Sequence, residues 1–172
     1  PGVSGLTGTI EGDEKGGTIR LDSKKATLEL AHIFRAPIAL DTLAAKARWQ
    51  RSPERLDVTI DEARFANADA EGTMAGAWHS LPRQDRERNP GYIELKGSLS
   101  RATLARASAY FPERLANTRD WLERSILGGR STGVRFELKG DLFHFPFAGG
   151  KEGRFLIEGD VRDGRLKYHP DW

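Results

Sequence analysis

The chain has 172 residues, of which 27 are basic and 25 are acidic, so its formal net charge is only +2, and it contains no cysteine. Without cysteine the chain has no disulfide, no thiolate metal site and no thiol catalysis. Both signs of charge alternate even within residues 83–88, whereas nucleic-acid-binding proteins typically carry a stripe of one sign, so we expect no nucleic-acid partner.

The first part of the chain consists of short stretches in which apolar and polar residues alternate. This pattern predicts strands with one buried face at 6–10, 19–21, 26–30, 43–49 and 56–60. Residues 63–78 have the same character but are rich in glycine and alanine. The polar stretch 81–90 holds two prolines and is predicted to be a loop, and a further strand is predicted at 92–99.

The pattern then changes to one that favours helix. Ser100 is a plausible N-cap for a helix over 101–110, which Phe111 and Pro112 would end. Thr118 can begin a second helix over 118–127, with glycines 128 and 129 as its stop signal. The inner face of this second helix is predicted to contain Trp121, Leu122, Ser125 and Ile126.

Strands resume at 134–142, where the apolar residues have even numbers. Phe143, Phe145 and Phe147 then place apolar residues on odd numbers, so a bulge or bend is expected near Asp141. In the last part, Asp163 and Gly164 are typical of a two-residue turn and predict a hairpin between 155–161 and 166–168.

These elements predict a mainly β chain of the α+β type. We expect an antiparallel, strongly curved sheet of about ten strands that forms an open groove or a sandwich, with two helices inserted around 101–127. The chain is interpreted as a single β-rich segment, 1–172, with strands in 1–99, a helical insertion in 100–128 and strands in 129–172. Since two helices cannot cover ten strands, the apolar face must close on itself or hold something apolar.

Three segments of the chain resemble one another. They read IELKGSL at 93–99, FELKGDL at 136–142 and, more loosely, FLIEGDV at 155–161. Repeated strand units that stack on their neighbours would give this pattern. Antiparallel strands that each have one polar face would also give it, without any repeat.

No motif in the chain predicts convincing chemistry. Residues 129–133 read G-x-S-x-G, but a nucleophile elbow needs a strand before the serine and a helix after it, and here the predicted order is reversed. A hydrolase would require Ser131 within hydrogen-bond reach of a histidine. The acidic pairs at 13–14 and 61–62 are more simply solvated, and His32, His79, His144 and His169 lack metal-ligand spacing. We therefore predict no catalytic residue, no metal site and no cofactor.

Five segments together resemble a known family. The most specific motifs in these segments are Tyr-Phe-Pro at 110–112, Trp-Leu at 121–122 followed by two glycines at 128–129, Phe-Pro-Phe at 145–147 and Tyr-x-Pro-x-Trp at 168–172. In this order they are similar to an internal segment of the YhdP-type proteins, in the AsmA-like group of Gram-negative envelope proteins. The similar segments are 5–23, 110–115, 118–130, 134–147 and 155–172.

The resemblance implies a large parent protein that is anchored in the inner membrane by an N-terminal helix and lies mostly in the periplasm. Since this chain begins with Pro1 and has no apolar run of roughly 18–20 residues, we interpret it as a piece that touches a membrane only through other parts of that parent. Family members are bridge-like proteins whose β-sheet groove carries phospholipid towards the outer membrane, and no catalytic role is implied. The implied partners are phospholipid acyl chains and neighbouring segments of the parent chain.

If this resemblance holds, inward-facing apolar strand residues would contact acyl chains. Strand alternation then gives the following candidate groove residues: Leu6, Ile10, Ile93, Leu95, Val134, Phe136, Leu138, Phe155 and Ile157. The alternative function is a structural or protein-interaction β-domain, a spacer without a ligand of its own whose strand edges pair with the rest of the parent.

Overall fold

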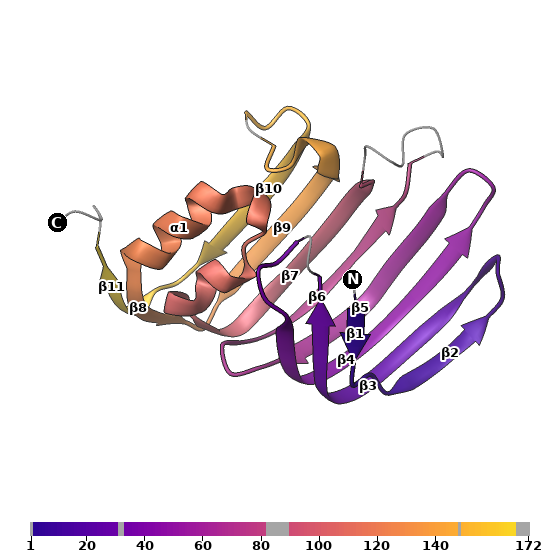
Figure 1. Ribbon diagram of the computed structural model, residues 1–172, viewed down its shortest axis with the longest axis horizontal. Coiled ribbons are helices and arrows are strands. Elements are labelled where there is room, and N and C mark those ends of the chain that lie inside the picture. The colour runs from indigo at the N-terminus through magenta and orange to yellow at the C-terminus, as the bar shows by residue number, and fades with distance from the viewer. Residues whose placement is uncertain (1, 31–32, 82–89, 148, 168–172) are drawn as a thin grey trace.

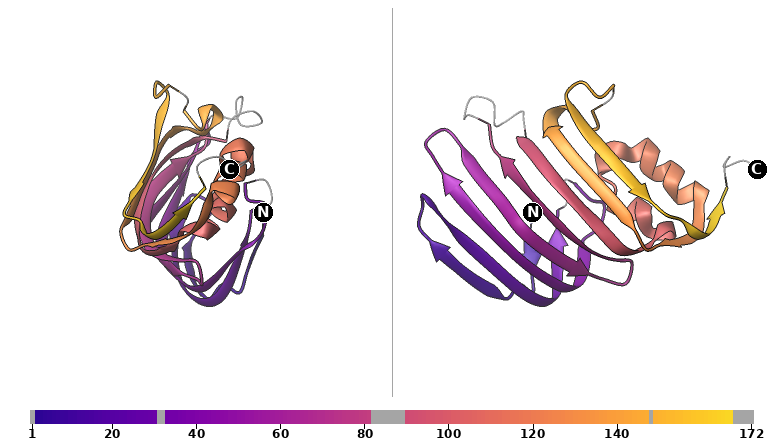
Figure 2. Two further views of the ribbon diagram at one scale, coloured as in Figure 1. Left: turned by 90° about the vertical axis from the view of Figure 1, so that its left-hand side faces the viewer. Right: turned by 180° about the vertical axis from the view of Figure 1, so that it is seen from behind.

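In the computed structural model, which describes residues 2–30, 33–81, 90–147 and 149–167, the chain forms one antiparallel sheet of eleven strands (Figure 1). The sheet is a single curved layer that does not close into a barrel, which confirms the predicted mainly β class in its open form (Figure 2). The strands are β1 (Gly2–Ser4), β2 (Gly8–Gly12), β3 (Gly16–Glu29), β4 (Ile38–Arg51), β5 (Leu56–Ala66), β6 (Ala70–His79), β7 (Tyr92–Thr103), β8 (Ile126–Ser131), β9 (Val134–Asp141), β10 (Gly153–Gly159) and β11 (Arg162–Leu166).

The order of strands follows the chain until β7, where the sheet forks. From β2 to β7 each strand pairs with the next in sequence. Most of β7 then pairs with β9, which pairs with β10, whereas Ala102 and Thr103 at its end pair with β8, which pairs with β11. Between β7 and β8 the chain forms the helical elements η1 (Leu104–Tyr110), η2 (Glu113–Leu115) and α1 (Ala116–Ser125).

The helical elements lie on the concave side of the sheet. Seen from its end, the sheet is strongly curved and the helices lie inside the curve (Figure 2, left). Phe111, between η1 and η2, lies against Phe155 of β10 with 6.3 Å between the ring centroids. The face towards which Phe155 points is therefore the concave face.

Few side chains in the described part of the chain are fully buried, because the sheet has only one layer. Ala26, Leu40 and Leu43 form a small core where β3 and β4 bend towards β1. The other buried apolar residues are scattered and are Ala63, Ala102, Val134 and Phe147. Most apolar strand residues are only partly buried, so the concave face keeps much of its apolar surface accessible.

The two strands predicted at 19–21 and 26–30 are one strand, β3. Lys25 has a left-handed backbone with φ of 60°, and the buried residues on either side of it, Ser23 and Ala26, are three positions apart instead of two. This shift in the alternation resembles a break between strands when only the sequence is read.

The helix boundaries differ from those predicted. Residues 100–103 belong to β7, so Ser100 is not an N-cap, and the first helical element is the 3₁₀ helix η1. The α1 helix ends at Ser125, and Gly128 and Gly129 lie inside β8. Pairing of Ala102 with β8 fixes the extended backbone there, so the tertiary contact overrides the local capping signal.

The change predicted near Asp141 is the end of a strand, since β9 ends at Asp141, the short 3₁₀ helix η3 (Leu142–His144) follows, and Phe143, Phe145 and Phe147 lie outside any strand. The hairpin predicted at Asp163 and Gly164 is wrong, since β10 and β11 pair with different strands and the two residues lie in β11, where its register with β8 shifts. Tyr168 lies outside the described residues, as does most of the predicted loop 81–90.

Two of the similar segments lie side by side in the sheet. Because β7 and β9 are antiparallel, their shared Glu-Leu-Lys tripeptides oppose Glu94 to Lys139 and Lys96 to Glu137. The Lys139 ammonium lies 2.8 Å from the Glu94 carboxylate, whose hydrogen bond raises the pKa of Lys139. A tripeptide of this kind is complementary to its own antiparallel copy, so the similarity favours this register.

We expect Phe147→Ala to lower the free energy of unfolding by about 3–5 kcal/mol. Phe147 is 5% exposed, and its ring lies against Gly140 and Gly153 on the paired strands β9 and β10, so truncation leaves a cavity. Urea denaturation followed by tryptophan fluorescence measures the loss. The control is Phe143→Ala, since Phe143 is 52% exposed and should change stability by only about 0.5 kcal/mol. Equal losses in the two variants would contradict this assignment.

Candidate functional site

The concave face carries a continuous apolar surface from β2 to β10. The cross-strand register places the apolar residues of successive strands directly opposite one another, in rows that run perpendicular to the strands. The central row consists of Ile10, Ile19, Ala47, Ile60, Gly76, Leu95, Leu138 and Phe155.

Three more rows flank the central one, and we call the four rows together the apolar face. The first contains Gly12, Gly17, Trp49, Val58, Trp78, Ile93, Gly140 and Gly153. The second contains Gly8, Leu21, Ala45, Ala63, Met74, Gly97, Phe136 and Ile157. The third contains Ser23, Leu43, Phe65, Gly72, Leu99, Val134 and Gly159.

Ser23 is the one polar residue in these rows, and its hydrogen bonds are satisfied. Its hydroxyl accepts a hydrogen bond from the Thr7 backbone N–H at 2.8 Å and donates one to the Thr7 carbonyl at 3.1 Å. The rows of the apolar face therefore contain no charged side chain, as is needed for contact with hydrocarbon.

Glycines let large aromatic rings lie flat across neighbouring strands. The Phe136 ring occupies the space above Gly97, and the Trp49 indole occupies the space above Gly17, where a Cβ would collide with it. The Trp78 indole lies against Gly91 and donates a hydrogen bond from Nε1 to the Pro90 carbonyl at 2.9 Å. Flat rings over glycine make the apolar face shallow while adding aromatic area to it.

The opposite, convex face is charged. Its side chains form ion pairs between neighbouring strands, and exposed pairs of this kind each stabilise the fold by only about 0–1 kcal/mol. Their main effect is to keep this face in water, so the two faces of one sheet differ sharply in polarity. The cross-strand pairs on this face include Arg48–Asp61 at 3.0 Å, Lys139–Glu94 at 2.8 Å, Arg154–Glu137 at 3.6 Å and Arg135–Glu158 at 3.9 Å.

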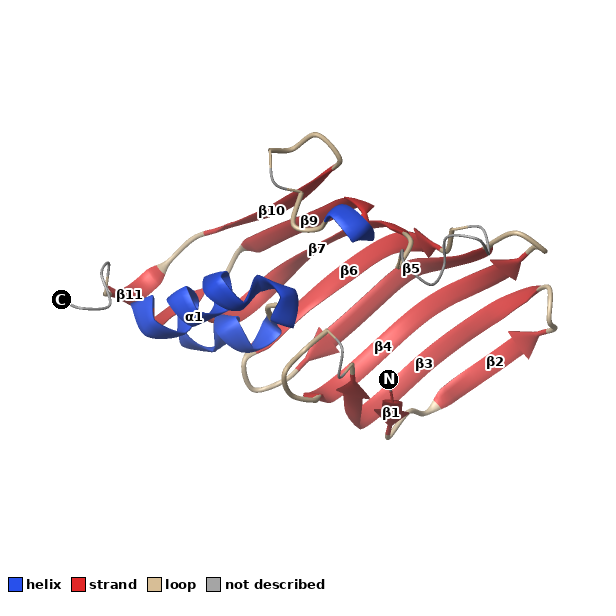
Figure 3. Cartoon of the chain, turned by 45° about the horizontal axis from the view of Figure 1, so that its top comes forward, coloured by secondary structure: helices blue, strands red, loops and turns tan. Residues whose placement is uncertain are grey.

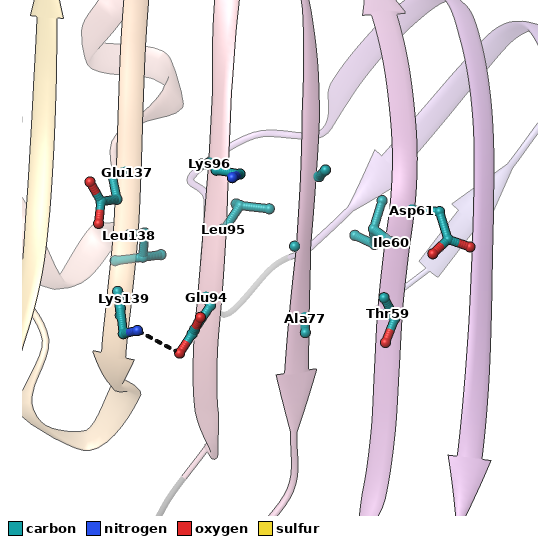
Figure 4. A pocket seen from close by; sticks show the side chains of 12 residues that line it. Thr59, Ile60, Asp61, Ala77, Glu94, Leu95, Lys96, Glu137, Leu138 and Lys139 are labelled. Atoms are coloured by element: carbon teal, nitrogen blue, oxygen red, sulfur yellow. Dashed lines mark ion pairs between the residues drawn. The ribbon is translucent and has the colours of Figure 1, made fainter.

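A hollow of about 500 Å³ lies at the middle of the sheet, across β5, β6, β7 and β9 (Figure 4). It coincides with the three smallest consecutive residues of β6, Ala75, Gly76 and Ala77, between longer side chains of the flanking strands. Its lining includes both Leu95 of the apolar face and the Glu94–Lys139 ion pair. Because most of its lining side chains alternate to the face opposite the apolar rows, the hollow lies on the charged, convex side of the sheet.

All the predicted groove residues except Leu6 lie on the apolar face, where the register brings them together. Leu6 lies in the connection between β1 and β2, outside any strand, and is 42% exposed. Ile10 is 71% exposed because β2 is at the edge of the sheet. That these residues contact acyl chains stays a prediction.

The sequence-based list omitted several residues of the same face. Trp49, Val58, Ile60 and Trp78 lie in its rows, between the predicted residues of β2 and those of β7. The alternation of apolar and polar residues at 43–49 and 56–60 was the available signal. Only the register tells which face of each strand continues the face of its neighbour.

Ser131 is part of a turn contact. Its buried hydroxyl donates a hydrogen bond to Asp160 Oδ1 at 2.9 Å, and Thr132 donates to the same carboxylate from its backbone N–H and its hydroxyl. The Ser131 hydrogen bond, with those from Thr132, lowers the pKa of Asp160. The hydrogen bonds of the described residues give Ser131 no histidine partner, and a strand follows it, so the elbow geometry is not present.

The other candidate polar residues have ordinary structural contacts. Asp13 accepts backbone hydrogen bonds from Lys15 and Gly16 at the tip of the β2–β3 hairpin. His79 stacks on Tyr92 with 5.4 Å between ring centroids, and His144 pairs with Glu152 at 2.7 Å. His32 and His169 lie outside the described residues.

Within 2–30, 33–81, 90–147 and 149–167, no three acidic, histidine or cysteine side chains come together as metal ligands would. In the same ranges no helix is both long and apolar enough to cross a membrane.

Comparison with protein families agrees with the resemblance seen in the sequence. The family model described as YhdP protein matches residues 1–172. The chain belongs to the YhdP family. This family is part of the AsmA-like proteins, a group of envelope proteins related to lipid transport and not a family of enzymes. No curated protein and no solved structure matches the chain.

We expect Ser131→Ala to destabilise this YhdP-family chain more at pH 7 than at pH 3. The Ser131 hydrogen bond lowers the folded-state pKa of Asp160 below its ordinary value of 3.8, so its contribution is present above that value and is lost as the pH falls through the folded pKa. Urea unfolding at both pH values measures the difference between wild type and variant.

The control for this prediction is Ser100→Ala. The Ser100 hydroxyl donates to the Glu71 backbone carbonyl, which does not titrate, so the effect of this variant should be the same at both pH values. A pH-independent effect of Ser131→Ala would contradict the assignment of its hydroxyl to Asp160.

Proposed function

We propose that this chain is one segment of a periplasmic groove that carries phospholipid between the inner and outer membranes and so supports the integrity of the outer membrane. The observation that carries the proposal is the apolar face, which runs unbroken across eight neighbouring strands on the concave side of the sheet while the convex side is charged. Membership of the YhdP family supports the same conclusion.

The dimensions of the apolar face suit a long hydrocarbon chain. Adjacent strands lie about 4.8 Å apart, so a row from β2 to β10 extends for roughly 34 Å. Each CH₂ group that leaves water for such a surface gains about 0.8 kcal/mol. The binding free energy of an acyl chain that lies along the rows would therefore depend mainly on the number of its CH₂ groups in contact with them.

The chemistry of the face also suits movement of a chain along it. Hydrophobic contact is not directional, so sliding by one strand replaces one set of apolar contacts by a similar one. Since the rows contain no charge and the hydroxyl of Ser23 is satisfied, they give a passing acyl chain no charged group to desolvate. The phospholipid headgroup would remain in water at the edge of the concave face.

We expect Leu95→Asp to reduce the phospholipid bound to the chain at least about tenfold. Leu95 lies in the central row of the apolar face, and a carboxylate there would have to lose its hydration under an acyl chain, which costs several kcal/mol. The purified chain is incubated with vesicles of phosphatidylethanolamine and phosphatidylglycerol, separated from them and extracted, and the lipid is quantified by mass spectrometry.

The matched control is Ser98→Asp, which adds the same charge to the convex face of the same strand. This variant should bind lipid as the wild type does, and circular dichroism must show that both variants are folded. Equal lipid in both variants would place binding elsewhere. No lipid on the wild type would reject the proposal for this chain and favour the structural spacer.

A further inference from the structure

Residues 104–125, which form η1, η2 and α1, are named here the cover segment. They lie in front of the apolar face at its β9–β10 end (Figures 1 and 3). Phe111 of this segment contacts Phe155 of β10, and Phe145, after η3, contacts the same ring with centroids 5.4 Å apart. The cover segment thus covers part of this end, where Phe155 remains 36% exposed and Ile157 48% exposed.

Apolar burial within the cover segment is slight. Neither η1 nor η2 has a buried residue, and the one buried residue of α1 is a serine, Ser125. Trp121, predicted from the sequence to face inward, is 43% exposed. Among the described residues, the buried Arg119 Nε and Ser125 Oγ have no hydrogen-bond partner. Few buried apolar contacts and unsatisfied buried groups are the marks of a segment that opens locally.

Polar contacts hold the outer part of the cover segment to the sheet. The Tyr110 hydroxyl donates to Asp69 at 3.0 Å and accepts from Asn67 at 2.9 Å, both in the β5–β6 turn. Arg106 of η1 lies 3.3 Å from the same Asp69 carboxylate. We call these four residues the latch. Burial, together with Asp69, raises the pKa of Tyr110, and the contacts with Asn67 and Arg106 oppose this rise.

Three further hydrogen bonds join η2 to the β3–β4 connection and to η3. The Glu113 backbone N–H donates to the Ile33 carbonyl in the β3–β4 connection at 2.8 Å. The Arg114 guanidinium donates to the carbonyls of Leu142 and Phe143 at 3.2 and 3.4 Å. Individual hydrogen bonds of this kind can open and close without disturbing the strand register.

We propose that the cover segment is a lid, held shut by the latch, which must open for an acyl chain to occupy the whole of the β9–β10 end of the apolar face. Opening separates Phe111 from Phe155 and so exposes more of Phe155, the last member of the central row, which is 36% exposed when the lid is shut. The lid follows the end of β7, where Ala102 and Thr103 pair with β8 instead of β9. The lid can therefore move while the rest of β7 stays paired with β9. This inference rests on the proposed function.

Hydrogen exchange of the Tyr110→Phe variant tests the latch. The substitution keeps the ring and removes the hydroxyl that bonds Asn67 and Asp69, so amides of 104–125 should exchange about fivefold faster while those of β3 to β5 stay unchanged. Tyr92→Phe, which removes the same atom from β7, should leave the cover segment unchanged. Exchange of 104–125 that is unaffected by Tyr110→Phe overturns the latch.

A covalent lock tests whether the lid must open. Because the natural chain has no cysteine, Ile33→Cys and Glu113→Cys provide a single pair of thiols at the hydrogen-bonded contact, which a short bis-maleimide can bridge. The bridged protein should take up a fluorescent phospholipid from vesicles of phosphatidylethanolamine and phosphatidylglycerol at least tenfold more slowly than the unbridged double variant. Tyr110→Phe should take it up faster than the wild type.

The outcomes separate the lid from the proposed function. Uptake by the wild type with equal rates for the bridged and unbridged proteins overturns the lid and leaves the groove intact. If the wild type takes up no lipid and Leu95→Asp does not differ from it, the proposed function is overturned, and the role of the lid with it. This conclusion would hold for any result of the hydrogen-exchange experiment on the cover segment.

Discussion

The register of the antiparallel strands is the constraint on which the rest of the structure depends. Side chains alternate between the two faces, so a slip of one residue in any strand would move its charged side chains onto the concave face. Several features favour the observed register. Glycines accept the rings of Trp49 and Phe136, and the two Glu-Leu-Lys tripeptides pair in opposite directions across β7 and β9. Because this register is kept from strand to strand, the apolar residues that alternate with polar ones in each strand all lie on one face of the sheet.

A single layer of this kind is an unusual way to fold an apolar sheet. Most sheets bury their apolar face against a second sheet or a layer of helices. Here the described helical elements contact Phe155 of β10, the β5–β6 turn and the β3–β4 connection, while most apolar residues of the central strands remain only partly buried, so the middle of the face is left accessible. An uncovered apolar surface of this extent calls for a ligand or a partner, which connects the fold to lipid handling.

The polar residues that resemble catalytic motifs have structural roles instead. The hydroxyl of Ser131 and the backbone of Thr132 bind Asp160, and this joins the β8–β9 turn to the segment before β11. Asp13 shapes a hairpin tip, and the latch around Asp69 attaches the cover segment. Polar contacts among the described residues thus position turns and the cover segment, whereas the surface proposed to bind a ligand consists of apolar side chains.

The sequence by itself determined the mainly β class, the apolar side of most strands and the family, because alternation and family motifs are local properties of the chain, but it left an open groove and a sandwich as alternatives. It did not determine pairing. Asp163 and Gly164 have the composition of a hairpin turn but lie inside β11, and Ser100 has the composition of a cap but lies in β7. Only the tertiary structure decided which strands meet, which residues complete the apolar face and where the cover segment closes it, because these depend on contacts between residues far apart in the chain.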